Sequence, residues 1–339
     1  MISNCFYYGV YSPQGFYSLA SRPNFSAERN YLLMSYSEKF KQDVFNSVKA
    51  VLQKNSMCYT DFCADDRSIG VYSADAGFRL LDATYGNCNA LSADGVFDFT
   101  DVGNSQQTEK LLEIRRQSVD RAVRFLSACR CISNDMVRLD VADMDIAKIN
   151  RYTSRLWANA SDGLRGSVGT EHKRFVTCIT PAGVELNMEA FDIYCERVVC
   201  VCDRSGACAG RIVDRIRRYA LSSGYDVISC ICPLNINSGP EHLIIPELKF
   251  GIFTCKHFHR ADFTNGRRVS AGRFLLHDES SAKRRMDFSF KAYKRLMQEV
   301  FTSLEGVREC DTQLDRLCCP QPSAQEVSGI IQTVTYIDF

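Results

Sequence analysis

The chain repeats part of its own sequence, and this repeat constrains the fold more than any other feature. Ser12-Pro13-Gln14-Gly15 returns as Thr180-Pro181-Ala182-Gly183, and Glu28-Arg29 returns as Glu196-Arg197. Both matches have an offset of 168 residues (180 − 12 and 196 − 28). The 339 residues suit two domains of ordinary size. The repeat therefore predicts two related units in tandem.

The same succession of apolar segments follows each Glu-Arg pair. Continuous apolar runs of this length are typical of strands buried on both faces of a parallel sheet. Strands that alternate with helices predict βαβ units. We expect strand, helix, strand and strand at 31–34, 43–54, 57–63 and 78–81, and again at 198–201, 210–222, 225–232 and 250–253.

The predicted fold is α/β, with two tandem units whose mostly parallel sheets are flanked by helices. Apolar residues at helical spacing, around 112–126 and 293–304, predict that each unit ends in a helical segment. The units are predicted to span 1–157 and 171–339. Residues 158–170 are predicted to be a linker, because they are largely small, polar and glycine-bearing.

Segment 197–259 contains a predicted strand, a Walker-type turn and a helix. It continues into Gly224-Tyr225-Asp226-Val227, Cys232-Pro233-Leu234 and Glu241-His242-Leu243-Ile244-Ile245-Pro246-Glu247-Leu248. With these pieces, the segment resembles the second domain of a bacterial tandem P-loop ATPase family of poorly assigned function, seen mainly in spore-forming Firmicutes. The first half has a fainter copy in 12–19 and 63–86, without the last of these pieces. The resemblance covers most of the chain and implies a P-loop NTPase fold in both units.

The phosphate-binding loop is degenerate in the second half. A working loop reads G-x-x-x-x-G-K-[ST], because glycines let backbone N–H groups surround the phosphates, the lysine neutralises them and the hydroxyl binds magnesium. The chain has Asp203-Arg204-Ser205-Gly206-Ala207-Cys208-Ala209-Gly210 there. Asp203 and Cys208 replace the glycines, Ala209 replaces the lysine and Gly210 replaces the hydroxyl residue. Asp203 is expected to repel phosphate.

Two arginines beside this loop are candidates to replace part of the missing charge. Arg204 lies inside the loop, and Arg211 follows it. Arg211 is two residues past the lysine position, about 200° round the helix, so we expect its side chain to point elsewhere.

The first half has diverged further. Its loop is predicted at 36–43, with no glycine, and its candidate phosphate-site residues are Ser37, Glu38, Lys39, Lys41 and Gln42. Asp82 follows the apolar run 78–81 and is a candidate remnant of a magnesium-binding carboxylate. The favoured interpretation is an ordinary turn former at the end of a strand. Thr254 is predicted to occupy the matching position of the second half.

Other candidate sites receive simpler interpretations. Cys255, His257 and His259 alternate after a strand and are three candidate zinc ligands, but no fourth ligand is identifiable from spacing. Glu247 is predicted to be a structural carboxylate rather than a catalytic base or a magnesium-site residue. The seventeen cysteines contain no C-x-x-C. Cys200, Cys202, Cys230 and Cys232 are therefore predicted to be reduced, strand-borne and largely buried.

Charge is unevenly distributed towards the C-terminus. Residues 256–295 contain eleven Lys and Arg and four Asp and Glu, a balance of 11 − 4 = +7. Residues 296–339 contain two Arg and seven Asp and Glu, a balance of 2 − 7 = −5. The segment from Lys256 to Arg295 can contact nucleic acid. Alternatively, the two segments pair with each other or form solvated helix faces.

Function is predicted from the degenerate loops. We expect a pseudo-ATPase that hydrolyses no nucleotide, needs no cofactor and acts by binding or scaffolding an unidentified protein partner. One alternative is an ATPase that binds ATP and Mg²⁺ by an unusual loop, and another is a basic nucleic-acid-binding module. The N-terminus lacks a signal-peptide pattern, and no apolar run approaches the ~20 residues that span a bilayer. We therefore expect a soluble cytoplasmic protein that does not bind membranes.

Overall fold

A computed structural model describes residues 5–20, 25–84, 92–101, 105–256, 261, 263, 266–276, 280–318 and 323–336. Contacts divide the chain into two compact units. Unit 1 comprises Met1–Arg124, Cys178–Gly183 and Glu299–Phe339, and unit 2 comprises Phe125–Thr177 and Val184–Gln298. This division differs from the predicted boundary at 158–170. Two long helices, α2 (Gln106–Ala142) and α6 (Ser280–Leu317), each contribute residues to both units.

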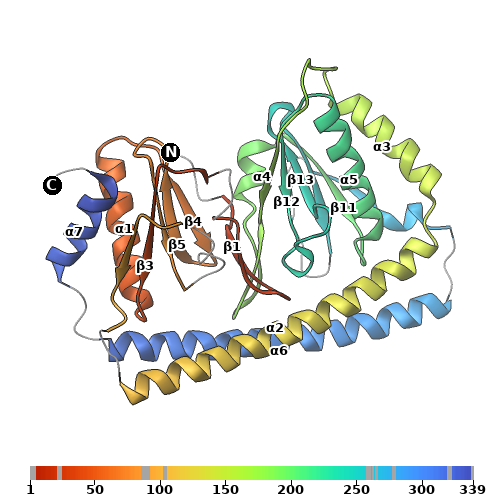
Figure 1. The fold of residues 1–339 in the computed structure, drawn as a ribbon. Helices are drawn as coiled ribbons and strands as arrows, with labels where there is room; N and C mark the ends of the chain where they lie inside the picture. Colours follow the sequence, from red (N-terminus) through yellow and green to blue (C-terminus); the bar gives the residue numbers. More distant parts are fainter. Residues whose placement is uncertain are drawn as a thin grey trace. The chain divides into compact units, whose positions relative to one another are not determined.

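Unit 1, in which Figure 1 labels β3, β4 and β5, contains a five-stranded mixed sheet. Its strand order is β4-β5-β6-β3-β7. β3 is parallel to β6 and β7, whereas β5 is antiparallel to β4 and β6. The strands are β3 (Arg29–Met34), β4 (Thr60–Ala64), β5 (Arg67–Ser73), β6 (Phe78–Asp82) and β7 (Gly95–Asp98). A separate hairpin, β1 (Gly9–Ser12) and β2 (Gly15–Ser18), precedes them.

Unit 2 contains a six-stranded mixed sheet in the order β15-β11-β14-β13-β12-β8. β11 is parallel to β14 and β15, and β12 is parallel to β8. β13 is antiparallel to both β12 and β14. The strands are β8 (Glu171–Arg174), β11 (Arg197–Cys202), β12 (Val227–Cys230), β13 (His242–Ile245), β14 (Phe250–Cys255) and β15 (Gly266–Ser270). β9 (Thr177–Thr180) and β10 (Gly183–Leu186) form a pair of their own.

The two sheets share one topology when each is considered by itself. The order β4-β5-β6-β3-β7 corresponds to β12-β13-β14-β11-β15, with the same parallel and antiparallel neighbours, and β8 is an addition. The expectation of mostly parallel sheets was wrong, because the sheets are mixed. An apolar run indicates burial on both faces but does not indicate the direction of the strand.

The register supports one predicted correspondence between the halves. Arg29 is opposite Phe78 in unit 1, and Arg197 is opposite Phe250 in unit 2. Four residues further along, Leu33 is opposite Asp82 and Val201 is opposite Thr254. Asp82 and Thr254 therefore occupy matching positions at the carboxyl ends of their strands.

A helix follows the first strand of each sheet. α1 (Glu38–Lys54) packs Phe40, Val44 and Phe45 into a buried core with β3 and β6. α5 (Ala207–Ser222) packs Ile212, Val213 and Ile216 against β11, β13 and β14. Both apolar stripes follow the helical period. The loop predicted at 36–43 was therefore misplaced, since most of it is the first turn and a half of α1.

Several other elements complete the units. α4 (Glu189–Tyr194) precedes β11, and α7 (Ala324–Thr335) packs against α1. Short 3-10 turns occupy Pro233–Asn235, Pro246–Leu248 and Ala271–Phe274. α2 and α6 run antiparallel, because Arg121 pairs with Glu299 while Asp135, further along α2, pairs with Arg285, earlier on α6.

The predicted linker lies within unit 2. α3 (Ile146–Ala160) ends inside it and packs against α5. The following loop bonds to the end of α5, where the N–H of Arg165 donates to the Ser223 carbonyl and that of Gly169 to the Leu221 carbonyl. These bonds tie the segment to unit 2 rather than leaving it as a free connection.

The described cysteines are free thiols. Cys200 lies buried on β11 and Cys230 lies buried on β12, as predicted. Cys202 ends β11 and is half-buried, and Cys232 follows β12 and is also half-buried. Among the helices that the structure describes, none is both long and apolar enough to cross a membrane.

Candidate functional site

The carboxylate of Asp203 lies at the N-terminus of α5. Asp203 follows directly after β11 and is 3% exposed. Its Oδ1 accepts hydrogen bonds from the N–H groups of Ser205, at 3.2 Å, and Gly206, at 2.9 Å. Its Oδ2 accepts one from the N–H of Ala209, at 2.8 Å. The backbone donors of a helix N-terminus form an anion site, and here a side chain of the same chain occupies it.

The rest of the loop supports this arrangement. Ser205 donates its hydroxyl to Oδ2 of Asp140, at 2.5 Å, and accepts from the N–H of Ala207, at 3.1 Å. Gly206 precedes the helix with φ of +87°, a conformation that favours glycine. A Cβ on Gly206 would lie 2.4 Å from Cε of Lys256, so the lysine side chain packs directly on this turn.

Lys256 brings a positive charge to the same turn. Its Nζ is 2.7 Å from Oε1 of Glu241, which is buried. Burial opposes the charged form of Lys256, but the negative charges of Glu241 and Asp203 outweigh it and raise the pKa of Lys256 above its ordinary value. Burial also raises the pKa of Cys232 to about 12, so this thiol stays protonated. The group is therefore an ion pair beside a capped helix, not a set of reactive nucleophiles.

Next to Glu241, His242 is fully buried and has a structural role. Its Nδ1 accepts from the N–H of Thr254 at 3.0 Å, which leaves the ring proton on Nε2. The ring stacks on Phe253 with centroids 4.3 Å apart. Thr254 in turn donates its hydroxyl to the Glu241 carbonyl at 2.6 Å. This network connects the ends of β13 and β14 beside the loop.

The remaining loop residues of the second half have simple roles. Cys208 and Ala209 are buried in the core under α5, and burial raises the pKa of Cys208 to about 12. A Cβ on Gly210 would meet no atom within 4 Å. Arg211 is exposed, as predicted from its position on the helix. Arg204 pairs with Asp287 at 2.7 Å and stacks over the Phe290 ring, so it is directed towards α6.

In unit 1, the N-terminus of α1 also receives a carboxylate. Ser37 is the capping residue, and its hydroxyl accepts from the N–H of Phe40 at 3.1 Å. Oδ1 of Asp315 on α6 accepts from the Ser37 hydroxyl, at 2.8 Å, and from the N–H of Lys39, at 3.0 Å. Ser35, which corresponds to Asp203 at the offset of 168, accepts from the N–H of Ser37 at 3.1 Å. The equivalent bond is present, but the charge comes from Asp315.

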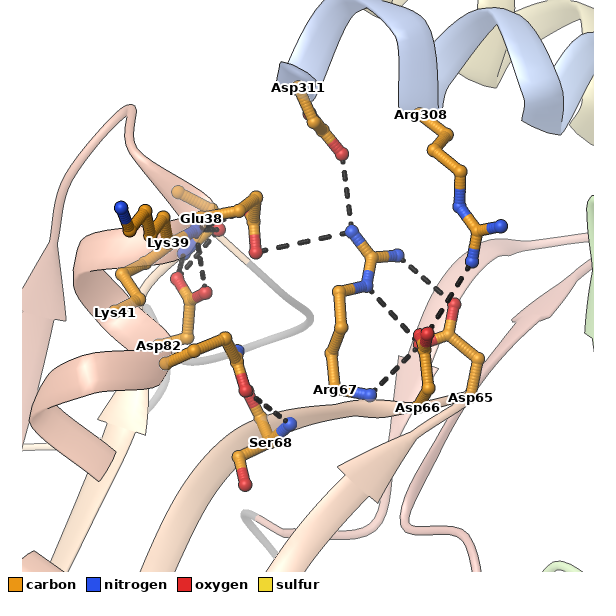
Figure 2. A network of polar contacts seen from close by, with 12 residues as sticks. Glu38, Lys39, Lys41, Asp65, Asp66, Arg67, Ser68, Asp82, Arg308 and Asp311 are labelled. Atoms are coloured by element: carbon orange, nitrogen blue, oxygen red, sulfur yellow. Dashed lines mark hydrogen bonds and ion pairs between the residues drawn. The ribbon is translucent and has the colours of Figure 1, made fainter. Parts of the chain in front are cut away.

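Lys41 lies at the centre of a buried charge cluster, and Figure 2 shows it between Glu38 and Asp82. Its Nζ is 2.5 Å from Oε1 of Glu38, 2.7 Å from Oδ2 of Asp82 and 3.1 Å from the Thr84 hydroxyl. Lys41 is 1% exposed. The ammonium group therefore occupies the space beside Asp82 in which the sequence suggested a magnesium ion. Asp82 also accepts from the N–H and the hydroxyl of Thr84, so the predicted turn is present as well.

Burial and charge act in opposite directions within this cluster. Burial opposes ionisation of Glu38, but the charges of Lys41 and Arg67 hold its pKa below the ordinary value. At Asp82, burial raises the pKa against the opposing effect of Lys41. Burial also disfavours charged Lys41, but the charges of Asp82 and Glu38 raise its pKa. The lysine remains protonated, and the cluster depends on it.

Arg67 extends the network towards α6 (Figure 2). It pairs with Asp65 at 3.1 Å and with Asp311 at 3.2 Å. Asp311 also accepts from Arg115 on α2 at 2.5 Å. The side chain of Gln42 exchanges two hydrogen bonds with the backbone of Ser68, whereas the side chain of Lys39 is exposed. These contacts tie α1, β5, α2 and α6 together within unit 1.

The other candidate residues have structural positions or lie outside the description. Glu247 is exposed and forms an ion pair with Arg165. His257 and His259 lie outside the described residues, while Cys255 ends β14. Among the residues that the structure describes, no group of three or more His, Cys, Asp and Glu side chains is arranged to hold a metal ion.

Comparisons with protein-family models, with curated proteins and with solved structures found no match for this chain.

Proposed function

We propose that this chain is a P-loop NTPase-like protein without competent nucleotide hydrolysis, which acts by binding or scaffolding. The observation that carries the proposal is the position of Asp203, whose carboxylate accepts three backbone N–H groups at the N-terminus of α5. In a working loop such donors bind phosphate. A nucleotide would have to displace a charge that already satisfies them.

The magnitude of this conflict is sufficient to prevent tight binding. A phosphate oxygen about 4 Å from the Asp203 carboxylate would be repelled by about 4 kcal/mol at an effective dielectric constant of 20. Each 1.4 kcal/mol is a factor of ten, so this repulsion alone corresponds to a nearly thousandfold loss of affinity. The lysine and magnesium-binding positions hold Ala209 and Gly210, so the usual attraction is missing as well.

Unit 1 supports the same proposal through a different set of side chains. Asp315 supplies the carboxylate at the N-terminus of α1, and Lys41 supplies the cation beside Asp82. Both the phosphate and the magnesium positions of the proposed ancestral site are thus satisfied by the chain itself. Because side chains of the protein already occupy both positions, a structural or binding role is favoured over catalysis.

The proposal is tested by calorimetry with ATP and Mg²⁺ on three proteins. The unmodified chain is expected to show neither tight binding nor turnover. A variant with Asp203→Gly, Cys208→Gly, Ala209→Lys and Gly210→Ser restores the loop and is expected to gain affinity. The matched control keeps Asp203 and carries the other three changes, and it should not bind. Micromolar binding or turnover by the unmodified chain would contradict the proposal.

An ATPase with an unusual loop is the alternative that this experiment also decides. Arg211 is exposed and Arg204 pairs with Asp287, so neither supplies charge at the first turn of α5. Lys256 is the cation that packs on this turn, and it is paired with Glu241. If the unmodified chain bound ATP and Lys256→Met removed the binding, the alternative would hold instead.

The proposed function includes a cytoplasmic location and a protein partner. The free thiols favour a reducing cytoplasm. The expected ligand of such a scaffold is a protein partner. Because the phosphate-binding loop lacks its lysine and hydroxyl residue, binding of this partner should not require a nucleotide.

A further inference from the structure

The first half of α6 presents a stripe of exposed cations. Arg284, Lys291 and Arg295 are exposed, and with Phe288 they follow the spacing i, i+4, i+7 and i+11. Residues at this spacing lie on one face of a helix, within about 60° of each other. At 1.5 Å per residue the stripe is about 17 Å long. It belongs wholly to unit 2.

The only acidic residue between 280 and 298 does not neutralise the stripe. Residues 280–298 contain six Lys and Arg and one acid, Asp287. Asp287 pairs with Arg204, which comes from the loop before α5. Arg285 on the neighbouring face is compensated by Asp135 of α2. The three cations of the stripe keep their charge available to solvent.

In the part of the acidic tail that the structure describes, acidic side chains contact residues of unit 1. Glu299 pairs with Arg121, and Asp311 pairs with Arg67 and Arg115. Asp315 instead accepts hydrogen bonds at the N-terminus of α1. These acids are committed to unit 1, so their contacts do not support pairing between the basic and acidic segments.

The exposure of the Phe288 ring is not explained if this face of α6 contacts only water. It is 73% exposed, in the middle of the stripe, with Arg284 one turn before it and Lys291 one turn after it. A large ring left in water is available for contact, and here cations flank it on both sides. Cations flanking an exposed aromatic ring are typical of surfaces that bind single-stranded nucleic acid, where phosphates meet the charges and a base stacks on the ring.

We propose that this stripe, formed by Arg284, Phe288, Lys291 and Arg295, binds single-stranded nucleic acid. The three cations contact successive phosphates, and one unpaired base stacks on Phe288. A duplex fits less well because its bases are already stacked and cannot reach a side chain outside the groove. A lipid surface fits less well because the stripe carries a single apolar residue. This inference does not depend on the proposed loss of nucleotide hydrolysis.

The test is fluorescence anisotropy of a labelled oligothymidylate of about twenty nucleotides with the full chain. We expect saturable binding at low salt, with log K falling against log salt at a slope near −2, since about three phosphates are contacted at ~0.7 each. Phe288→Ala is expected to weaken binding about tenfold, and Phe288→Leu similarly, because only an aromatic ring stacks. The variant with Arg284, Lys291 and Arg295 all changed to alanine is expected to lose measurable binding.

The control removes the same number of exposed cations elsewhere in unit 2, by changing Arg151, Arg155 and Arg211 to alanine. Its affinity should stay within about twofold of the unmodified chain. The proposal is overturned if the chain does not bind, if the control weakens binding as much as the stripe variant, or if Phe288→Ala binds normally. Tighter binding to a duplex or to anionic vesicles than to the single strand would overturn it too.

Discussion

Replacing Lys41 by methionine should destabilise unit 1 strongly. The lysine is 1% exposed and its ammonium group contacts two buried carboxylates, Glu38 and Asp82. Methionine fills similar space without charge, so both carboxylates lose their cation. Removing one partner of a buried ion pair costs about 3–5 kcal/mol, because the remaining charge is left uncompensated. This cost is a large share of the about 5–15 kcal/mol that stabilises a typical protein.

The pH dependence of this loss follows from the sign of the pKa changes. Without Lys41, the folded-state pKa values of Glu38 and Asp82 both rise, since the cation that lowers them is gone. A carboxyl group with a raised folded-state pKa binds more protons in the folded than in the unfolded state, so stability increases as the pH falls through that pKa. The free energy of unfolding that Lys41→Met loses relative to the unmodified chain should therefore be larger near pH 7.5 than near pH 5.

Hydrogen exchange of β3 and β6 measures the stability of unit 1 in this experiment. The only tryptophan, Trp157, lies on α3 in unit 2, so its fluorescence during urea unfolding follows the other unit. Lys39→Met is the matched control, because Lys39 is exposed on the same helix and should change stability by no more than about 0.5 kcal/mol. Adding Asp82→Asn to Lys41→Met should recover part of the loss. If Lys41→Met and Lys39→Met exchange at the same rate, the cluster does not have the energetic role described.

Three further outcomes are expected. Gly206→Ala should cost at least about 1 kcal/mol in urea unfolding, because φ is +87° and the new Cβ would meet Lys256, whereas Gly239→Ala meets no atom within 4 Å and should be nearly neutral. Ser323→Ala removes a capping box shared with Glu326 and should cost about 1 kcal/mol, seen as faster hydrogen exchange in α7. Thiol titration of the unfolded, unreduced chain should find close to seventeen thiols, and a substantial shortfall would contradict the interpretation of the cysteines as reduced residues.

The sequence predicted the first strand and following helix of each unit, and the match between Asp82 and Thr254. These features depend on local apolar periodicity and on the internal repeat, and both can be read from a single sequence. The antiparallel strands β5 and β13 were not predicted at all, and an apolar run would not have indicated their direction. α2 and α6 were predicted only in part, since their division between the two units depends on contacts rather than on local pattern.

The loop that begins at Asp203 was chosen from the sequence, but the hydrogen bonds of the Asp203 carboxylate were not predicted. Asp203 was expected to repel phosphate, whereas the structure adds that it is itself the ligand of the helix N-terminus. The local signal was present, because Asp, Ser and Gly before a helix are typical capping residues. The approach of Asp315 to Lys39 joins residues 276 positions apart, and no local pattern indicates such a contact.

The two units place one carboxylate at the N-terminus of the helix after the first strand, but they take it from different parts of the chain. Asp203 is the residue immediately after β11, and its counterpart, Ser35, makes an equivalent bond without a charge. Asp315 supplies the charge that Ser35 lacks. A carboxylate at a helix N-terminus contributes about 0.3–1 kcal/mol, and up to ~2 when partly buried. Because two unrelated side chains reach the same kind of position, stabilisation of the helix is a sufficient reason for each to be there.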